Sequence, residues 1–330
     1  MGAGTEGINA DAVGQRHALL RALRDFFYRR DYTEVDTPYL GRTAPSDPYI
    51  EPLSVRVGGA GPYYLHTSPE IAMKKLLARG HAKIFQVCKV FRVEELEEHH
   101  SVEFTMLEWY MPGTYAGAMA ETADLVRTAS RSLGAVGAPV KSGPWPSYRV
   151  GDLFIEAAGF DPLPLNRASL LAAMEERGFH GLSGADSWED LFFRCFVQQV
   201  EPLIRKKGEG PFFVKDWPAS LTAMARRKDD LTAERFELYM GGLEIANGYT
   251  ELLDAEEQLG RIARDNAERK RMGRKTFHPD RAFLDALGRI SGPVAGVSVG
   301  VDRLQMALCG IRNIGDVLPD RLTLKKGGPS

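Results

Sequence analysis

Apolar residues near the start of the chain recur every three or four positions. Between residues 12 and 30 they are Leu19, Leu20, Leu23, Phe26 and Phe27, with arginine and aspartate between them. This spacing predicts an amphipathic helix. The helix should end before Pro38, because a proline disfavours helical geometry in the residue that precedes it.

Two stretches of alternating apolar and polar residues predict antiparallel hairpins. In the second hairpin Gly241 and Gly242 supply the positive φ angles of a tight turn, whereas the first has a longer polar loop. The predicted strand pairs are 84–92 with 103–110, and 236–240 with 243–253.

Three further elements complete the predicted pattern. They are a helix that begins at Ser68-Pro-Glu70 and stops at Gly80, a charged helix over 254–271, and a strand over 296–301 that gives way to a helix near Asp302. No alternation of strand and helix typical of a parallel sheet is visible. The sequence therefore predicts an α+β fold built on an antiparallel sheet.

We expect one domain over residues 12–322, between a flexible N-terminus at 1–11 and a flexible tail at 323–330. The interval 114–230 has mostly helical periodicity and no recognisable chemistry. It is interpreted as an insertion around the site.

Composition excludes several classes of function. Lys and Arg number 42 against 44 Asp and Glu, so no global positive field is present to hold nucleic acid. The cysteines Cys88, Cys195 and Cys309 are far apart and odd in number, which favours a reducing cytoplasm over a disulfide framework. No signal peptide or membrane-length apolar run is present, so a membrane role is not expected.

A carboxylate interrupts an apolar strand face in the first hairpin. Period two places Phe104, Met106, Glu108 and Tyr110 on one face. A buried carboxylate there requires a cation. A structural ion pair is the more common explanation for a single glutamate, and a bound ligand is the other.

The second hairpin brings two carboxylates together. Tyr239 should face Glu244 across the turn, with Glu237 one diagonal step away. Neighbouring carboxylates repel, and a divalent cation with oxygen ligands, most simply Mg²⁺, relieves that repulsion.

Asn247, Tyr249 and Glu251 occupy odd-numbered positions of the same strand, which strict alternation places on the other face. Strict alternation would separate this set from Glu244. We therefore predict a β-bulge near residues 246–248 that turns both sets inward.

Two arginines complete the set of candidate functional residues. The order of the segments that contain them resembles that of a known enzyme family. Arg92 lies in Phe91-Arg-Val-Glu94 and Arg303 in Gly300-Val-Asp-Arg303; guanidinium groups suit phosphate oxygens. With Pro38 and Glu103-Phe-Thr, these segments resemble the three signature motifs of class II aminoacyl-tRNA synthetases.

Further segments narrow the resemblance to the lysyl branch. They are Thr67-Ser-Pro-Glu70, Glu103 to Tyr110, and Asn247-Gly-Tyr-Thr-Glu251. Within that branch the chain is most similar to the short paralogues that attach β-lysine to elongation factor P. The resemblance covers about residues 12–318.

The resemblance implies a role for each matching residue, in an antiparallel sheet flanked by helices that is usually homodimeric. Arg92 and Arg303 would be the catalytic residues that bind the ATP phosphates. Glu94, His100 and Phe104 would contact the nucleotide, and Glu237 and Glu244 would bind Mg²⁺. The lysine pocket would comprise Glu70, Glu108, Tyr110, Asn247, Tyr249, Glu251 and Ser298.

Three positions depart from the pattern of those paralogues. Ser298 stands where they have alanine and lysyl synthetases have glycine, so the preference between α-lysine and β-lysine stays open. Val93 replaces a usual asparagine. The loop at 94–100 is more acidic than usual, which affects recognition of the acceptor.

The acceptor is expected to be a lysine of elongation factor P rather than tRNA. A full lysyl-tRNA synthetase has an oligonucleotide-binding domain before its catalytic core, whereas here the first helix begins near residue 12. The alternatives are an enzyme that acts on tRNA or another acceptor, and a non-catalytic paralogue with a binding role. The basic run at 269–275 is interpreted as a solvated helix end, with an acidic partner as the less favoured alternative.

Overall fold

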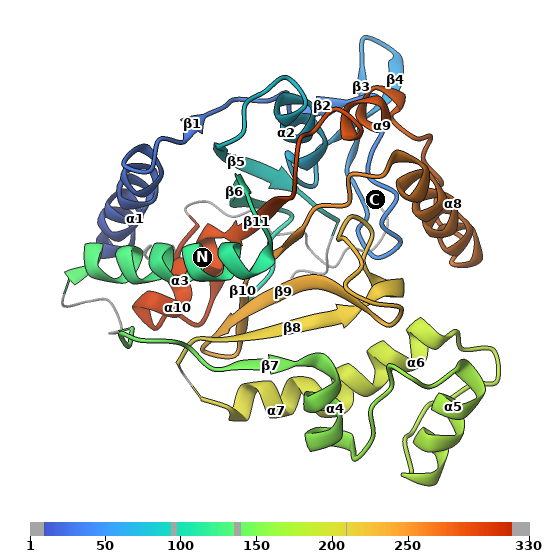
Figure 1. The fold of residues 1–330 in the computed structure, drawn as a ribbon. Coiled ribbons are helices and arrows are strands. Elements are labelled where there is room, and N and C mark those ends of the chain that lie inside the picture. Colours follow the sequence, from blue (N-terminus) through green and yellow to red (C-terminus); the bar gives the residue numbers. More distant parts are fainter. Residues whose placement is uncertain (1–9, 94–97, 135–139, 209, 319–330) are drawn as a thin grey trace, which may run out of the picture.

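The computed structural model describes residues 10–93, 98–134, 140–208 and 210–318 (Figure 1). An eight-stranded sheet forms its centre, in the order β1-β5-β6-β11-β10-β9-β8-β7. Pairing is antiparallel except at the two edges, where β1 pairs with β5 and β7 with β8 in parallel. The strands are β1 (Thr33–Glu34), β5 (Ile84–Phe91), β6 (Glu103–Pro112), β11 (Val294–Gly300), β10 (Leu243–Thr250), β9 (Thr232–Met240), β8 (Phe212–Pro218) and β7 (Ser147–Arg149).

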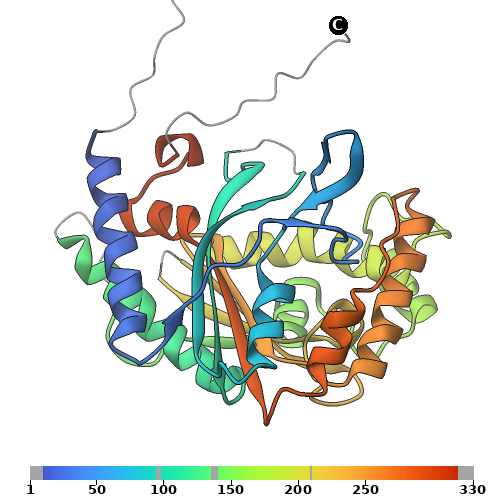
Figure 2. The same cartoon turned by 90° about the horizontal axis from the view of Figure 1, so that it is seen from above.

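Helices cover both faces of this sheet, which confirms the predicted α+β fold. Figure 2 shows α1, α3 and α10 on one side of the sheet and α8 and α9 on the other. The helices are α1 (Ala10–Tyr28), α2 (Glu70–Leu77), α3 (Tyr115–Ser132), α4 (Val150–Ala158), α5 (Arg167–Glu176), α6 (Trp188–Cys195), α7 (Glu201–Lys206), α8 (Ala255–Arg271), α9 (Arg281–Leu287) and α10 (Val301–Cys309), with a π-helical turn at Phe196–Val200 and 3₁₀ turns at Ala219–Leu221 and Ile314–Asp316.

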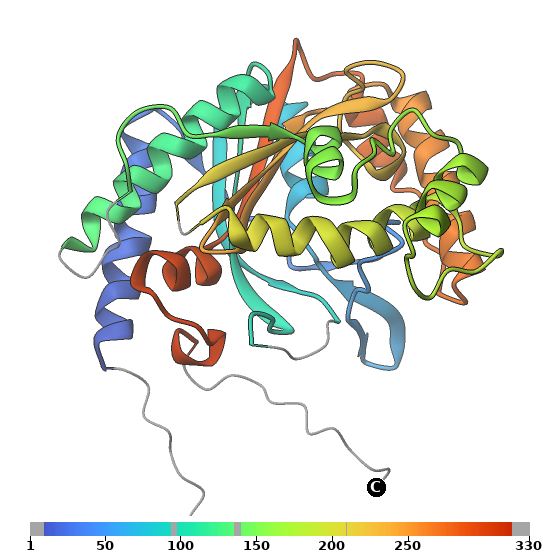
Figure 3. The same cartoon turned by 90° about the horizontal axis from the view of Figure 1, so that it is seen from below.

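A second, smaller sheet lies beside the first. It has the order β2-β4-β3, from Leu40–Gly41, Ala60–Leu65 and Ser54–Val57. The helices α4 to α7 pack together along β7 and β8 (Figure 3). The interval 114–230 therefore contributes two strands to the main sheet as well as helices.

Alternation along β6 separates the core from the site. Leu107 and Trp109 are fully buried in the cluster formed with α1, α3 and α10. The even-numbered residues from Phe104 to Tyr110 lie on the opposite face, as the sequence predicts. One strand thus serves both the core and the site.

Both predicted hairpins are confirmed, and the second has the expected pairing across its turn. Glu108 pairs with Gln86 in the first, and in the second Glu244 pairs with Tyr239 and Asn247 with Glu237. The bulge lies between Glu244 and Ala246, so its predicted position at 246–248 is wrong by about one residue. The extra residue is Ile245, which is buried.

The interpretation of the basic run at 269–275 as a solvated helix end holds for the exposed Lys270, Arg271 and Lys275, but it is wrong for Arg269. Arg269 is fully buried and donates to the carbonyl oxygens of Asp47 at 2.8 Å and Ile50 at 3.1 Å. It also lies 2.5 Å from a carboxylate oxygen of Glu51. The loop at 44–51 has no regular partner strand, so a guanidinium satisfies its carbonyl groups.

Candidate active site

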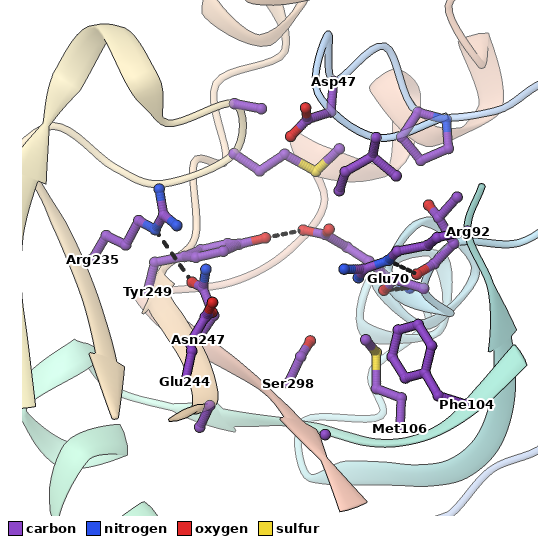
Figure 4. A pocket seen from close by; sticks show the side chains of 18 of the residues that line it. Asp47, Glu70, Arg92, Phe104, Met106, Arg235, Glu244, Asn247, Tyr249 and Ser298 are labelled. Carbon is purple, nitrogen blue, oxygen red and sulfur yellow. Dashed lines mark hydrogen bonds between the residues drawn. The ribbon is translucent and has the colours of Figure 1, made fainter. Parts of the chain in front are cut away.

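A cavity of about 310 Å³ opens on the polar face of the sheet. Its floor comes from β6, β10 and β11, and its walls come from the loops at 45–50 and 221–225 and from the start of α2. Figure 4 shows Arg92 and Phe104 at one side of it, Arg235 at the other, and Glu70, Tyr249 and Ser298 between them. This volume is at the lower end for a small-molecule site.

Most residues predicted for the site meet in this cavity. The lining includes Glu70, Arg92, His100, Phe104, Glu244, Asn247, Tyr249, Ser298 and Arg303. Glu108 is buried behind the lining and contacts Ser68 and Ser298 of it, and Tyr110 and Glu251 are buried behind it, in contact with Glu108 and Lys74. Glu237 does not line the cavity, and Glu94 lies outside the described residues.

One end of the cavity is cationic and aromatic. The guanidinium of Arg92 lies 5.2 Å from the centroid of the Phe104 ring, and its Nε donates to the carbonyl oxygen of Thr67 at 3.2 Å. Arg303 donates to the carbonyl oxygens of His99 at 3.2 Å and Glu244 at 3.4 Å. Two guanidinium groups beside a half-buried aromatic ring suit a nucleotide, with its base on the ring and its phosphates on the cations.

The predicted metal carboxylates differ in their surroundings. Glu244 faces the cavity, whereas Glu237 is buried, accepts from the hydroxyl of Tyr239 at 2.7 Å and pairs with Arg235 at 2.6 Å. Burial, together with the charge of Glu244, raises the pKa of Glu237 to about 8. A cation beside the two carboxylates would relieve this repulsion. Within the described residues, no cluster of three or more acidic, histidine or cysteine side chains is placed to hold a metal.

At the other end of the cavity lies a carboxylate that accepts hydrogen bonds from three hydroxyl groups. Glu108 accepts from Ser68 at 2.6 Å, Tyr110 at 2.7 Å and Ser298 at 2.8 Å. Burial, and then the charge of Glu70, raise the pKa of Glu108 to about 7, while the three hydroxyl groups oppose that rise. Hydroxyl groups thus hold Glu108 in place, and no cationic side chain of the described residues contacts its oxygens.

A second carboxylate group lies deeper, around an ammonium that the sequence analysis did not identify. Lys74 Nζ lies 2.6 Å from Glu70 Oε1 and 2.5 Å from Glu251 Oε2. The hydroxyl of Tyr249 donates to the same oxygen of Glu70 at 2.5 Å. The other oxygen of Glu251 has no hydrogen-bond partner among the described residues. A buried acceptor without a donor makes Glu251 a candidate contact for a cationic ligand.

Three residues of the site were not predicted from the sequence: Lys74, which pairs with two carboxylates, Ser68, which donates to Glu108, and Arg235, which lines the cavity. Lys74 follows Glu70 by four residues, which places both on one helical face, between Met73 and Leu77 on the apolar side. A lysine within an apolar helical stripe was the available signal. Ser68 also accepts from the Glu70 N–H at 3.0 Å, although the N-cap residue itself is Pro69.

Glycines make room for the deep end. A Cβ at Gly296 would lie 2.3 Å from Glu251 Oε1 and 2.6 Å from Tyr110 Cε1. A Cβ at Gly248 would instead lie 2.7 Å from the ring of Phe236, on the core face. Both positions require a residue without a side chain, because the close atoms belong to buried groups.

No helix in the described ranges is long and apolar enough to cross a bilayer. The cysteines Cys88, Cys195 and Cys309 are all unpaired.

Comparison with known proteins agrees with the geometry. The family model for tRNA synthetases class II (D, K and N) matches residues 9–319. The elongation factor P (R)-beta-lysine ligase of Pseudoalteromonas translucida (strain TAC 125) is 38% identical over 313 residues, which are 92% of this chain and 93% of that protein. The protein of the same name from Salmonella typhi is 35% identical with the same coverage.

Proposed function

The chain belongs to the class II tRNA synthetase family (D, K and N), and on this premise we propose that it is an ATP-dependent ligase for elongation factor P. It activates lysine or (R)-β-lysine as the aminoacyl-adenylate and transfers it to a lysine side chain of that factor. Relatives named for this activity match 92% of the chain.

One observation carries the proposal: a single cavity joins a cationic, aromatic end to a buried carboxylate end. The first end matches ATP, and the second matches the ammonium groups of a diamino acid. The reacting groups, the substrate carboxylate and the α-phosphorus, would then meet between the two ends.

In the first step a carboxylate oxygen of the amino acid attacks the α-phosphorus of ATP and pyrophosphate leaves. We propose that Arg92 stabilises the negative charge that develops on the phosphorus oxygens, and that Arg303 binds the adenine face opposite Phe104 and the terminal phosphate. Such positioning and charge stabilisation require no covalent enzyme intermediate.

In the second step the amine of the acceptor lysine attacks the carbonyl carbon of the adenylate. An amide bond forms, AMP leaves with the bonding electrons, and the amine loses a proton. Mg²⁺, held by Glu237 and Glu244 in our proposal, would supply charge compensation for the triphosphate.

The amino-acid end is assigned by charge and size. Glu108 and Glu251 would bind ammonium groups, with Glu70, Asn247, Tyr249 and Ser298 around the rest of the substrate. The ring of Tyr249 adds cation-π attraction of about 0.5 to 2 kcal/mol. Tyr110 completes the wall beside Glu108.

The test combines exchange and mass measurements. Purified protein is incubated with ATP, Mg²⁺ and either lysine isomer, and ATP-pyrophosphate exchange is measured. Elongation factor P or tRNA is then added and weighed by intact mass spectrometry. The proposal expects one aminoacyl increment on elongation factor P; an increment on tRNA alone would contradict it.

A homodimer and a cytoplasmic location are further proposals. Exposed apolar residues on and after the first helix, Val13, Tyr28, Tyr39 and Leu40, support a dimer contact on that side. Light scattering on the purified protein should give twice the mass of one chain. The three unpaired cysteines support a reducing compartment.

A further inference from the structure

A lysine side chain lies at the deep end of the amino-acid site without access to solvent. Lys74, on α2, has a side chain that is 0% exposed, and its ammonium contacts Glu70 and Glu251. The thioether sulfur of Met224 lies at 3.4 Å, and the rings of Tyr249 and Phe283 at 5.6 and 5.9 Å. Burial alone would lower the pKa of Lys74, but Glu251 and Glu70 raise it above its usual value. The group is therefore a permanent cation.

The charges around Lys74 do not balance in the protein alone. Three carboxylates lie at this end of the cavity: Glu70 from α2 lines it, and Glu108 from β6 and Glu251 after β10 are buried behind the lining. The hydroxyl groups of Tyr110 and Tyr249 donate to Glu108 and Glu70, and burial and these carboxylates raise the pKa of both tyrosines. One ammonium against three carboxylates leaves two negative charges when all are ionised.

We propose that Lys74 is a fixed counter-ion that neutralises one of the three carboxylates, so that the two remaining negative charges match the two ammonium groups of a diamino-acid substrate. It is a positioning residue that sets the charge selectivity of the site. The inference rests on the proposed function and names the feature of lysine and β-lysine that the site selects.

Without Lys74 the site would have one carboxylate in excess, and a proton would take the place of the cation. Burial, and then the charge of Glu70, already raise the pKa of Glu251 to about 8, against the lowering effect of Lys74. Removing that cation raises the pKa of Glu251 further. The substrate ammonium then has to displace a proton, so its affinity falls most at low pH and recovers as the pH rises.

The first experiment compares lysine-dependent ATP-pyrophosphate exchange of the wild type, Lys74→Met and Lys75→Met from pH 6 to pH 9. Lys75 is the matched control, because it lies next along the same helix with its side chain 31% exposed and pairs with Asp280. We expect Lys74→Met to raise the KM for lysine at least about tenfold at neutral pH, since one unit of pKa is a tenfold change in ionised carboxylate. The difference should shrink as the pH rises, with the KM for ATP unchanged. Lys75→Met should match the wild type.

A second comparison separates charge balance from packing. Glu251→Gln alone leaves two carboxylates and one ammonium for a substrate with two ammonium groups. Adding Lys74→Met restores two negative charges. The double variant should therefore have a KM for lysine about threefold or more below that of Glu251→Gln, a rescue that a packing role could not produce. This comparison also tests the charge-balance role of Lys74 if the Lys74→Met variant alone folds poorly.

The outcomes are distinct. Lack of exchange by the wild type with both lysine isomers overturns the proposed function and this inference with it. Exchange by the wild type, together with a Lys74→Met change in KM that is absent or independent of pH, overturns the inference alone. So does a double variant that binds lysine no better than Glu251→Gln.

Discussion

A single methyl group added at Gly296 should close the ammonium end of the site. Gly296 lies in β11, opposite Tyr110 of β6 and Tyr249 of β10. The new Cβ would lie 2.3 Å from Glu251 Oε1 and 2.6 Å from Tyr110 Cε1. Both separations are far below a van der Waals contact, and both neighbouring side chains are buried. The carboxylate and the ring would have to move away from the cavity floor.

The expected size follows from overpacking and from loss of the site. Overpacking a core costs about 1 to 3 kcal/mol, which corresponds to a drop in Tm of roughly 1 to 4 °C for a chain of this length. Displacing Glu251 removes a charge-assisted contact to the substrate, worth about 1.5 to 3 kcal/mol. The KM for lysine should therefore rise about tenfold to a hundredfold, because each 1.4 kcal/mol is a tenfold change.

Gly248→Ala is the matched control for Gly296→Ala. Its Cβ would lie 2.7 Å from the ring of Phe236 and 2.9 Å from Val297, on the opposite face of the sheet. Both variants should lower Tm, but only Gly296→Ala should raise the KM for lysine in the exchange assay, with the KM for ATP unchanged. If the two variants raise the KM for lysine equally, or neither does, the assignment of Glu251 and Tyr110 to the amino-acid end is refuted.

Three further variants test other parts of the site. Arg92→Ala should lower the exchange rate by about a hundredfold to a thousandfold with an unchanged circular dichroism spectrum, and near-normal exchange would contradict its role. Ser298→Ala removes a hydroxyl that lowers the pKa of Glu108, so the fall in the KM for lysine with rising pH should move to higher pH; an identical profile would show that this hydrogen bond is not needed. Arg269→Ala should lower stability by about 3 kcal/mol, measured by urea denaturation, because it leaves buried carbonyl groups of the loop at 44–51 unpaired; the exposed Lys270→Ala is its control, and equal stabilities would contradict the buried role.

The sheet could be predicted because its two patterns are local. Period two along residues 103–110 and the glycine pair at Gly241 and Gly242 determine pairing and face without information from distant residues. The same alternation placed Glu108 on the face opposite Trp109, as the structure confirms. The bulge was expected from the need to bring Glu244 and Asn247 to one side, but its position at Ile245 depends on packing that the sequence does not reveal.

Long-range electrostatic partners could not be predicted in this way. Lys74 and Glu251 are separated by just over half of the chain, and only folding places them 2.5 Å apart. The same holds for Arg269, whose guanidinium contacts the carbonyl oxygens of Asp47 and Ile50 rather than solvent. A charged residue on a helix is usually exposed, so its burial becomes visible only when its partners are known.

The raised pKa values at the amino-acid end explain how the site can reject neutral amino acids. Burial, together with the charge of Glu70, raises the pKa of both Glu108 and Glu251, so a positive charge beside them is needed to keep both carboxylates ionised in a dry pocket. In the proposed function, the substrate ammonium provides this countercharge. A neutral side chain of equal length would leave these groups protonated or unpaired, and that penalty exceeds the loss of a methylene contact. In the proposed function, selection for a diamino acid therefore follows from the excess of carboxylates in a dry pocket.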